Sequence, residues 1–597
     1  MKIGKKSNGA SPAAARIEVV GSVRQSQLMF AFGIGSMIDF VDTTAMILGT
    51  DTWTWANGDF DNPYRLNNKN LENLLNVKYF IKPKPEEKKS FGPTNADIEA
   101  TLFPKTLYCL HCRRLISEEG RFFKKGKLNC VCGKDLVPSR FVAVCPKGHI
   151  EDFPFSWWVH GQENEEYRGK GADCCAPNKL KMYFTNNRTD MANLWIECMA
   201  EGCGAKRSMR TASAFHALAN YRCSGNRPWL GDKEDDCAET LKLCMRTESN
   251  VYFPITQSAL TVPPFSSDLA IEIQKYLGLL SGGFTDSSRK DIVRRIIGKH
   301  EFRNCPPKFV EELFIKLEKK AEQPTSVQSI MEEEYIALMG GLTAESSDNF
   351  ITKAEEIPPK YSKLISRVVA VERLTVVTAL TGFTRLNADD SAVAPLSKEK
   401  KEWLPAIEQK GEGVFIEFDA ALLKRWADYT KARYDKMGKS LGTAFYDKEN
   451  FSPQYVFLHT FAHLFIRELS NICGYSAASM KEKIYSTYEG GSEMNGILIY
   501  TSSADAEGSL GGLIEQAKKE NMELLIDTLI ERASWCSMDP LCISSEEQGV
   551  NDLNFAACYA CTLIPETSCE FRNLLLDRAA VVGTTDNEKN GVLGWLK

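Results

Sequence analysis

The chain has 597 residues, of which 43% are hydrophobic and 25% charged, and its formal net charge is −5. This length is too great for one hydrophobic core and indicates several domains, while the ordinary composition allows each domain to bury its own core. The net charge excludes a chain that is basic overall, so contact with nucleic acid would require a local basic patch.

The expected compartment is the cytoplasm, without membrane contact. The first residues, MKIGKKSNGASPAAARIEVVG, are charged early but lack the continuous apolar stretch of a secretory signal. The sequence contains no run of about 18 apolar residues, so no membrane span is expected. Because thiols stay reduced in the cytoplasm, 19 cysteines in short-spaced pairs favour structural zinc, with disulfides as the weaker alternative.

The N-terminal half is predicted to contain two regions. Residues 1–100 mix short apolar runs with turns and contain the RQSQ and FGIG motifs, in VRQSQLMFAFGIGSMIDF. A polar, proline-containing loop follows from Ile81. Twelve of the cysteines then lie between Cys109 and Cys244, so residues 101–260 are assigned to zinc-rich modules.

Three metal sites are expected in residues 101–260. The pairs in YCLHC and NCVCG resemble a zinc ribbon, although the second pair is C-x-C. CPKGHIEDFPFSWWVHG offers a mixed site, unless its second histidine is a core residue beside two tryptophans. The expected ligands are, site by site, Cys109, Cys112, Cys130 and Cys132; Cys145, His149, His160 and Cys174; and Cys198, Cys203, Cys223 and Cys237. Cys175 and Cys244 are spare cysteines that could replace one of these.

The remainder of the chain divides at about residue 450. Residues 261–450 are expected to be mainly helical, as the spacing of apolar residues in DIVRRIIGKHEF and KFVEELFIKLEKKAEQ indicates. In residues 451–597, YVFLHTFAHLFIRELSNIC predicts a buried helix and NGILIYTSS a buried strand. EGSLGGL predicts a turn, and IEQAKKENMELLIDTLIERAS a long amphipathic helix. Cys305 and Cys473 stand alone and are expected to be ordinary buried thiols.

A fourth metal site is expected near the C-terminus. Its ligands would be Cys536, Cys542, Cys558 and Cys561, and Cys569 could replace one of them. A catalytic cysteine is the alternative, but a nucleophile needs an activating base, and no histidine follows His463 in the sequence. Four sites correspond to about three to four zinc ions per chain.

Signals for catalysis are weak. His459 and His463 share one helix face, but the glutamate of H-E-x-x-H is missing, so packing with hydrogen-bonded imidazoles is favoured over metal binding. Asp505 and Glu507 stand before a glycine-rich helix start, which could hold a phosphate or a cation, act as acid and base, or merely pack. The MGKS sequence at 437–440 mimics a P-loop but has Arg433 where the first glycine is required, so no intrinsic ATPase activity is expected.

These elements together predict a multidomain α+β protein. It would have a zinc-ribbon-rich N-terminal half, a helical middle and an α/β C-terminal domain closed by a four-cysteine zinc site. The sequence also resembles, nearly end to end, the DrmB family of the bacterial DISARM antiphage system. The resemblance rests on VRQSQLMFAFGIGSMIDF, RFVAVCPKGHIEDFPFSWWVHG, VYFPITQSALTVPPF, ERLTVVTALTGFTRL and WLPAIEQKGEGVFIEF. The C-terminal region resembles a zinc-associated domain of unknown function found in or beside certain DNA helicases.

The resemblance implies a non-catalytic, zinc-containing subunit of an antiphage defence complex, with a DrmA-like helicase ATPase as partner and DNA as ligand. Five basic residues of the first ribbon are candidates for DNA contact, although a solvated face is the slightly favoured interpretation: Arg113, Arg114, Lys124, Lys125 and Lys127. A metal-dependent hydrolase or nuclease acting through His459, His463, Asp505 and Glu507 is the alternative function.

Overall fold

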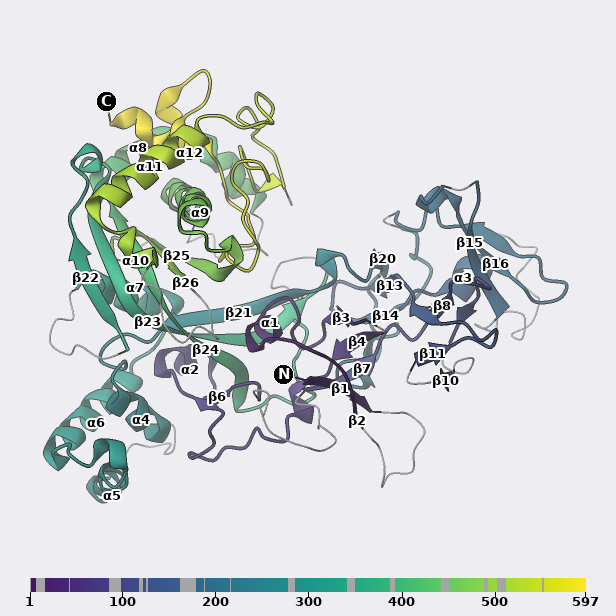
Figure 1. Cartoon of the computed structure of the whole chain (residues 1–597), viewed down its shortest axis with the longest axis horizontal. Coiled ribbons are helices and arrows are strands. Elements are labelled where there is room, and N and C mark those ends of the chain that lie inside the picture. The colour runs from purple at the N-terminus through teal and green to yellow at the C-terminus, as the bar shows by residue number, and fades with distance from the viewer. Residues whose placement is uncertain are drawn as a thin grey trace. The chain divides into compact units, whose positions relative to one another are not determined.

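The computed structural model describes most of the chain (Figure 1). The described residues are 2–6, 17–41, 43–84, 98–117, 122–124, 127–161, 179–186, 188–214, 216–277, 285–340, 349–386, 392–441, 451–487, 492–501, 512–549 and 552–596. They form two compact units, each built from several segments of the chain. The first unit comprises Met1–Asn57, Pro83–Thr256 and Leu380–Lys401, and the second comprises Gly58–Lys82, Gln257–Ala379 and Glu402–Lys597.

The first unit is built mainly from small β-sheets. Its largest sheet has the strand order β2-β1-β7-β4-β3, in which β1 and β7 run parallel. The strands are β1 (Lys2–Lys6), β2 (Ile17–Ser22), β3 (Met37–Asp39), β4 (Thr44–Ile47) and β7 (Ile98–Leu102), and one short helix, α1 (Gln25–Met29), follows β2. The buried β4, with Ala45, Met46 and Ile47 fully enclosed, supplies the core of this sheet.

Short strands of two to five residues frame the cysteines of the first unit. They form sheets in the orders β12-β8-β9, β10-β11, β14-β13-β20, β15-β16-β17 and β18-β19. Their bounds are β8 (Leu107–Cys109), β9 (Leu115–Ile116), β10 (Phe122–Lys124), β11 (Lys127–Asn129), β12 (Leu136–Pro138), β13 (Phe141–Val144), β14 (Ile150–Asp152), β15 (Leu180–Phe184), β16 (Leu194–Cys198), β17 (Lys206–Ser208), β18 (Asn226–Arg227), β19 (Asp232–Lys233) and β20 (Lys242–Met245), with the helix α3 (Phe155–His160) between β14 and β15. Sheets this small bury little apolar surface, so they need other tethers.

The second unit is organised by an eight-stranded sheet. Its main path is β21-β23-β24-β26-β25, with β22 paired to β23, and β6 paired to β24 and β5. The strands are β5 (Arg65–Leu66), β6 (Tyr79–Ile81), β21 (Phe253–Leu260), β22 (Ile351–Glu355), β23 (Ile365–Thr384), β24 (Trp403–Phe418), β25 (Met480–Ser486) and β26 (Asn495–Thr501). β23 and β24 are long antiparallel partners, and the many β-branched residues in ISRVVAVERLTVVTALTGFT favour this extended conformation.

Helices of the second unit fall into two groups, besides the short α2 (Lys69–Leu75). The first group is α4 (Asp268–Leu277), α5 (Asp286–Ile297), α6 (Pro307–Ala321) and α7 (Val327–Leu338). The second group is α8 (Ala420–Ser440), α9 (Pro453–Cys473), α10 (Gly512–Glu515), α11 (Lys519–Ala533) and α12 (Ala579–Val582). The middle of the chain is therefore helical in its first part, whereas β23 and β24 extend the sheet. No helix in the described ranges offers an apolar stretch long enough to cross a bilayer.

The helix α9 confirms the expected buried helix, and local sequence sets its ends. The Ser452 side chain accepts a hydrogen bond from the Tyr455 N–H, Pro453 occupies the first turn, and Gly474 ends the helix at φ 71°. Thirteen of its residues are buried, which requires cover on several faces. α9 lies against β25 and β26 and contacts α8, α11 and α12 (Figure 1).

One further C-terminal prediction is confirmed, and another is confirmed only in part. NGILIYTSS contains the buried strand β26, which pairs with β25 and β24. The expected amphipathic helix is present as α10 and α11, with a turn between them. Both helices contribute buried side chains, among them Leu513, Met522 and Ile526, to the core around α9.

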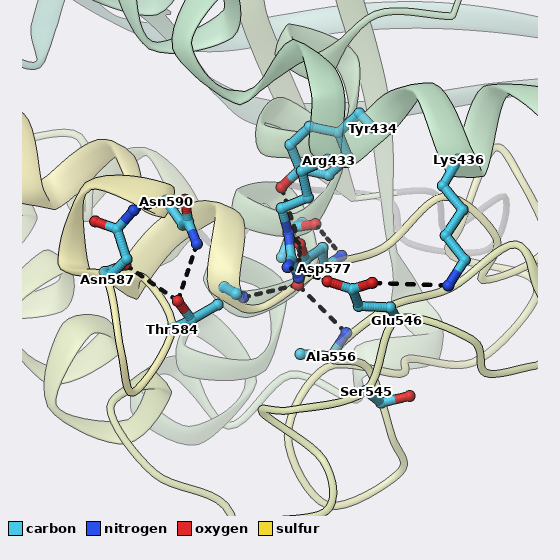
Figure 2. Close-up of polar contacts among 12 residues, drawn as sticks. Arg433, Tyr434, Lys436, Ser545, Glu546, Ala556, Asp577, Thr584, Asn587 and Asn590 are labelled. Atoms are coloured by element: carbon cyan, nitrogen blue, oxygen red, sulfur yellow. Dashed lines mark hydrogen bonds and ion pairs between the residues drawn. The ribbon is translucent and has the colours of Figure 1, made fainter.

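The segment between α11 and α12 is tied to α8 by a buried carboxylate (Figure 2). The described residues of this segment contain no α-helix and no pairing beyond an isolated bridge. Asp577, at its end, accepts hydrogen bonds from Arg433 at 3.0 and 3.1 Å and from the Tyr434 hydroxyl at 2.9 Å. The next residue, Arg578, is also fully buried and donates to the Ala533 carbonyl at 2.9 Å. The Asp-Arg pair thus anchors an otherwise irregular segment.

Candidate metal centres

Five groups of side chains in the described ranges bring potential ligand atoms within 4.8 Å of one another. Two consist of cysteines alone, and three combine cysteine with histidine. The groups are Cys109, Cys112, Cys130 and Cys132; Cys145, His149, Cys223 and Cys237; His160, Cys198 and Cys203; Cys536, Cys542, Cys558 and Cys561; and His459, His463, Glu482 and Cys569.

The first group joins the two cysteine pairs of the ribbon. The Cys109 and Cys132 sulfurs are 3.6 Å apart, and the Cys112 and Cys130 sulfurs are also 3.6 Å apart. Zinc–sulfur bonds of about 2.3 Å in a tetrahedral site place sulfurs about 3.8 Å apart, whereas a disulfide needs about 2 Å. The C-x-C pair turns sharply because Gly133 adopts φ 82° and donates its N–H to the Cys130 carbonyl at 2.8 Å. The geometry suits one tetrahedral ion.

The second group is fully buried and contains an oriented histidine. Nδ1 of His149 lies 3.4 Å from the Cys145 sulfur and 3.7 Å from the Cys223 sulfur. Its Nε2 lies 3.1 Å from the Glu234 carboxylate. Burial opposes the charged imidazole, but Cys223 and Glu234 outweigh burial and raise the His149 pKa. A carboxylate behind a ligating histidine is the usual outer partner in zinc sites, because it fixes the ring and makes Nδ1 more basic.

The third group is built around the end of α3. Nε2 of His160 lies 3.4 Å from the Cys203 sulfur, and its Nδ1 lies 2.8 Å from the Ser156 carbonyl oxygen. This carbonyl holds the proton on Nδ1 and directs the Nε2 lone pair toward the cysteines. With Cys198, the group supplies three ligands.

The second and third groups differ from the combinations expected from sequence. His149 and His160 were expected in one site, and Cys198 and Cys203 with Cys223 and Cys237, but the structure exchanges these partners. Elements explain the exchange: α3 packs against β16 and β17, which carries His160 to Cys198 at the end of β16. His149 instead directly precedes β14, and β14 contacts β18, the strand that begins three residues after Cys223.

The C-terminal four-cysteine group joins cysteines of the irregular segment after α11. Sulfur–sulfur distances are 3.5 Å for Cys536–Cys558, 3.7 Å for Cys542–Cys561 and 3.6 Å for Cys558–Cys561. Contact with Cys542 lowers the pKa of the Cys561 thiol, and the Thr562 hydroxyl at 3.1 Å acts in the same direction. The same contact raises the pKa of the Cys542 thiol, and ligation of zinc requires the thiolate form of both.

Cys569 lies apart from the C-terminal four-cysteine group. It was a candidate replacement ligand for that group, but its sulfur is 3.2 Å from Nε2 of His459. His463 and Glu482 complete this fifth group. The cysteines expected to be solitary, Cys305 and Cys473, are half-buried, and neither belongs to any of the five groups in the described ranges.

The sequence did not point to two acidic residues of these groups, and four of the predicted candidates lie outside the described residues. Glu482 and Glu234 carry no local motif, and the only signal for the fifth group was the H-x3-H spacing of its histidines. The spare Cys244 lies in β20, outside the five groups. Four candidates lie outside the described residues: Cys174, Cys175, Asp505 and Glu507.

The candidate DNA-contacting residues are described only in part. Arg113 and Arg114 are exposed, directly after the first cysteine pair. Lys124 and Lys127 stand opposite each other in the β10–β11 pair, and Lys125 lies outside the described residues.

Comparison with known proteins finds one family match in the N-terminal half of the chain and one in the C-terminal half. Residues 24–253 match a domain of unknown function (DUF8724), and residues 461–562 match the MrfA Zn-binding domain. The second match contains the whole C-terminal four-cysteine group. The DISARM protein DrmB of Bacillus paralicheniformis (strain ATCC 9945a / NCIMB 11709 / CD-2) is 32% identical over 587 residues, covering 92% of this chain and 98% of that protein. The resemblance seen in the sequence is thereby confirmed: the chain belongs to the DrmB family of DISARM proteins.

Proposed function

We propose that this chain is a non-catalytic, zinc-containing subunit of an antiphage defence complex, which partners a helicase-like ATPase and helps to bind DNA. The observation that carries the proposal is the end-to-end similarity to a DISARM protein DrmB, which covers 98% of that protein. A match over nearly the full length of both chains argues for the same role in the same kind of system, rather than for one shared module.

The chemistry of the cysteine groups supports a structural role for zinc. Catalytic zinc sites usually keep one position open for water or substrate, whereas four protein ligands close the tetrahedron. Cys109, Cys130, Cys536 and Cys542 are buried members of the two closed four-cysteine groups. We propose zinc at the two four-cysteine groups and at the two groups of the first unit that combine cysteine with histidine, with the ions holding together loops that bury little apolar surface.

The contribution to DNA binding would come from basic residues of the first ribbon. Arg113 and Arg114 are exposed, Lys124 ends β10 and Lys127 begins β11, and Lys125 follows Lys124 in the sequence. Because the net charge is −5, the chain has no overall attraction for a polyanion. A local strip makes few phosphate contacts, so the complex with the ATPase should bind DNA much more tightly than this chain alone.

The decisive experiment is co-expression with a helicase-like ATPase encoded beside this chain, followed by DNA binding at several salt concentrations. Each phosphate contact on duplex DNA contributes about 0.9 to the slope of log affinity against log salt. Replacing Lys124, Lys125 and Lys127 by Gln should make the slope of the complex shallower by up to about three, and Arg113→Gln with Arg114→Gln by up to about two. Sequence preference should stay the same, because phosphate contacts do not read bases.

A matched control comes from the helical group of the second unit. Arg294 and Lys308 are highly exposed basic residues of α5 and α6, and their replacement by Gln should leave the slope unchanged. Failure of the two chains to co-purify would contradict the partnership. Equal slopes for the ribbon variants and the unaltered complex would place the DNA contact elsewhere. ATP turnover by this chain alone would contradict a non-catalytic role.

A further inference from the structure

A buried cluster of four side chains lies beneath α9, apart from the four-cysteine groups. It is called the His–Glu–Cys cluster here and consists of His459, His463, Glu482 and Cys569. Oε1 of Glu482 lies 3.0 Å from Nε2 of His459 and 3.3 Å from Nε2 of His463. The two imidazoles and the carboxylate side chain have no exposed surface. Three elements contribute: α9, β25 and the irregular segment after the C-terminal four-cysteine group.

Hydrogen bonding alone leaves this cluster unsatisfied. Nδ1 of His463 lies 3.1 Å from the Thr562 carbonyl oxygen, which can only accept, so the proton of the neutral ring is on Nδ1. Nε2 then presents a lone pair to the Glu482 carboxylate, which is itself an acceptor. In the described part of the chain, Nε2 of His463 and Oε2 of Glu482 are buried without any hydrogen-bond partner. Buried lone pairs that face one another call for a cation between them.

The balance of charge leads to the same requirement. In the described ranges, the ion pairs of Glu482 are with His459 and His463 only. Burying a carboxylate without a full positive partner costs several kcal/mol. A divalent cation beside one carboxylate and one thiolate makes the group neutral, with both histidines free to remain uncharged ligands.

Backbone contacts at Cys569 match those of the other cysteine-containing groups. Its sulfur accepts the N–H of Phe571 at 3.2 Å and of Asn573 at 3.2 Å. Cys536 and Cys223 each accept an N–H from the residue two positions later, at 3.4 Å. N–H donors aimed at sulfur favour the thiolate, which is the form that binds metal.

We propose that the His–Glu–Cys cluster binds a zinc ion, separate from the ion of the C-terminal four-cysteine group. Two imidazole nitrogens, one carboxylate oxygen and one thiolate form a ligand set suited to tetrahedral zinc, and the thiolate disfavours magnesium or calcium. His459 and His463 have the i, i+4 spacing that lets two helical histidines share one ion, and Glu482 comes from β25 rather than from the helix. The match to the MrfA Zn-binding domain covers residues 461–562 and includes only two of the four ligands.

The ion has a structural role in this proposal. Four protein ligands leave no open position, and the site joins the buried helix α9 to β25 and to the segment that carries Cys569. The ion would hold the segment at Cys569, seven residues after the match to the Zn-binding domain ends at residue 562.

The first test uses crystals of the unaltered full-length chain and anomalous scattering at the zinc absorption edge. The expected result is a peak about 2.3 Å from the Cys569 sulfur, between the two imidazoles, in addition to the peaks of the four-cysteine groups. Peaks at the four-cysteine groups with none at this cluster would overturn the proposal. A peak of unchanged height in data collected just below the zinc edge would indicate a lighter metal and overturn the assignment to zinc. Because no residue is altered, this test does not depend on a variant that folds.

The second test measures zinc per chain by elemental analysis of full-length variants. Cys569→Ser and Glu482→Gln should each lower the content by one ion relative to the unaltered chain. Cys473→Ser is the matched control, because Cys473 is a half-buried cysteine at the end of α9 outside the cluster, and it should retain every ion. Full zinc content in soluble Cys569→Ser and Glu482→Gln protein would contradict the proposal.

Discussion

Replacing Asp577 by Asn should strongly destabilise the C-terminal segment. Oδ2 accepts two hydrogen bonds from Arg433 and one from Tyr434, while Oδ1 accepts the N–H groups of Ala556 at 3.3 Å and Ala579 at 3.0 Å (Figure 2). The carboxylate is fully buried, and the Arg433 side chain is only 12% exposed. Asparagine has the same shape but no charge, and its amide N–H groups would face donors. Removing one partner of a buried ion pair typically costs about 3–5 kcal/mol.

The lower part of that range is expected, because Arg433 keeps a half-exposed partner, Glu546, at 3.2 Å. Unfolding of a chain with several domains is not a two-state process, so the loss is best measured locally by hydrogen exchange. A loss of about 3 kcal/mol should speed exchange of the amides in residues 553–582 roughly a hundredfold, since about 1.4 kcal/mol corresponds to a factor of ten. Asp428→Asn, at an exposed position of the same helix, should change exchange by less than about 0.5 kcal/mol. Equal protection in both variants would refute the anchoring role of Asp577.

Three further outcomes are expected. Replacing Cys558 and Cys561 together by Ser should remove one zinc ion per chain and leave little soluble protein, and normal solubility with full zinc content would exclude them as ligands. His149→Ala and His160→Ala should each remove one ion and the double variant two, whereas a shared site would lose only one. Burial raises the pKa of Glu72 from 4.5 to about 7. Between pH 4.5 and pH 7 the folded chain therefore keeps a proton on Glu72 that the unfolded chain has released, and the stability of the fold falls as the pH rises through this window. In Glu72→Gln this part of the loss should be absent, as urea unfolding at pH 5 and pH 7.5 would show; an identical pH dependence would contradict it.

Local patterns predicted the elements whose structure is decided locally. The helix α9 was recognisable because apolar residues fill its length, and the structure then shows that Ser452, Pro453 and Gly474 set its ends. The two four-cysteine groups were recognisable for a similar reason: each contains pairs held by one short turn, so spacing alone brings two sulfurs together.

Long-range pairing decided what the sequence could not show. His149 and Cys223 are 74 residues apart, and nothing in their spacing distinguishes this partner from Cys198 or Cys203. Glu482 is one of 78 acidic residues and has no motif around it. Its position beside the two histidines becomes apparent only because β25, which carries it, packs against α9. The long strands β23 and β24 escaped prediction for the same reason, because a strand needs a partner strand to form.

The segment between α11 and α12 explains why such different tethers occur together. Its described residues lack α-helices and paired strands beyond one bridge, so its backbone hydrogen bonds form turns and single links, such as Phe555 N–H to the Leu576 carbonyl, rather than a regular ladder. The C-terminal four-cysteine group closes loops from Cys536 to Cys561, the His–Glu–Cys cluster attaches Cys569 to α9, and Asp577 attaches the end of the segment to α8. Each tether divides a long stretch of the unfolded chain into shorter loops, and the entropy cost of closing a loop rises with its length. Tethers of different chemistry also fail under different conditions: a chelator would act on the two groups proposed to bind zinc, whereas high salt weakens only exposed ion pairs and leaves the buried Asp577 pair in place. A chain treated with chelator should therefore lose order at residues 536–569 before it loses the anchor at Asp577.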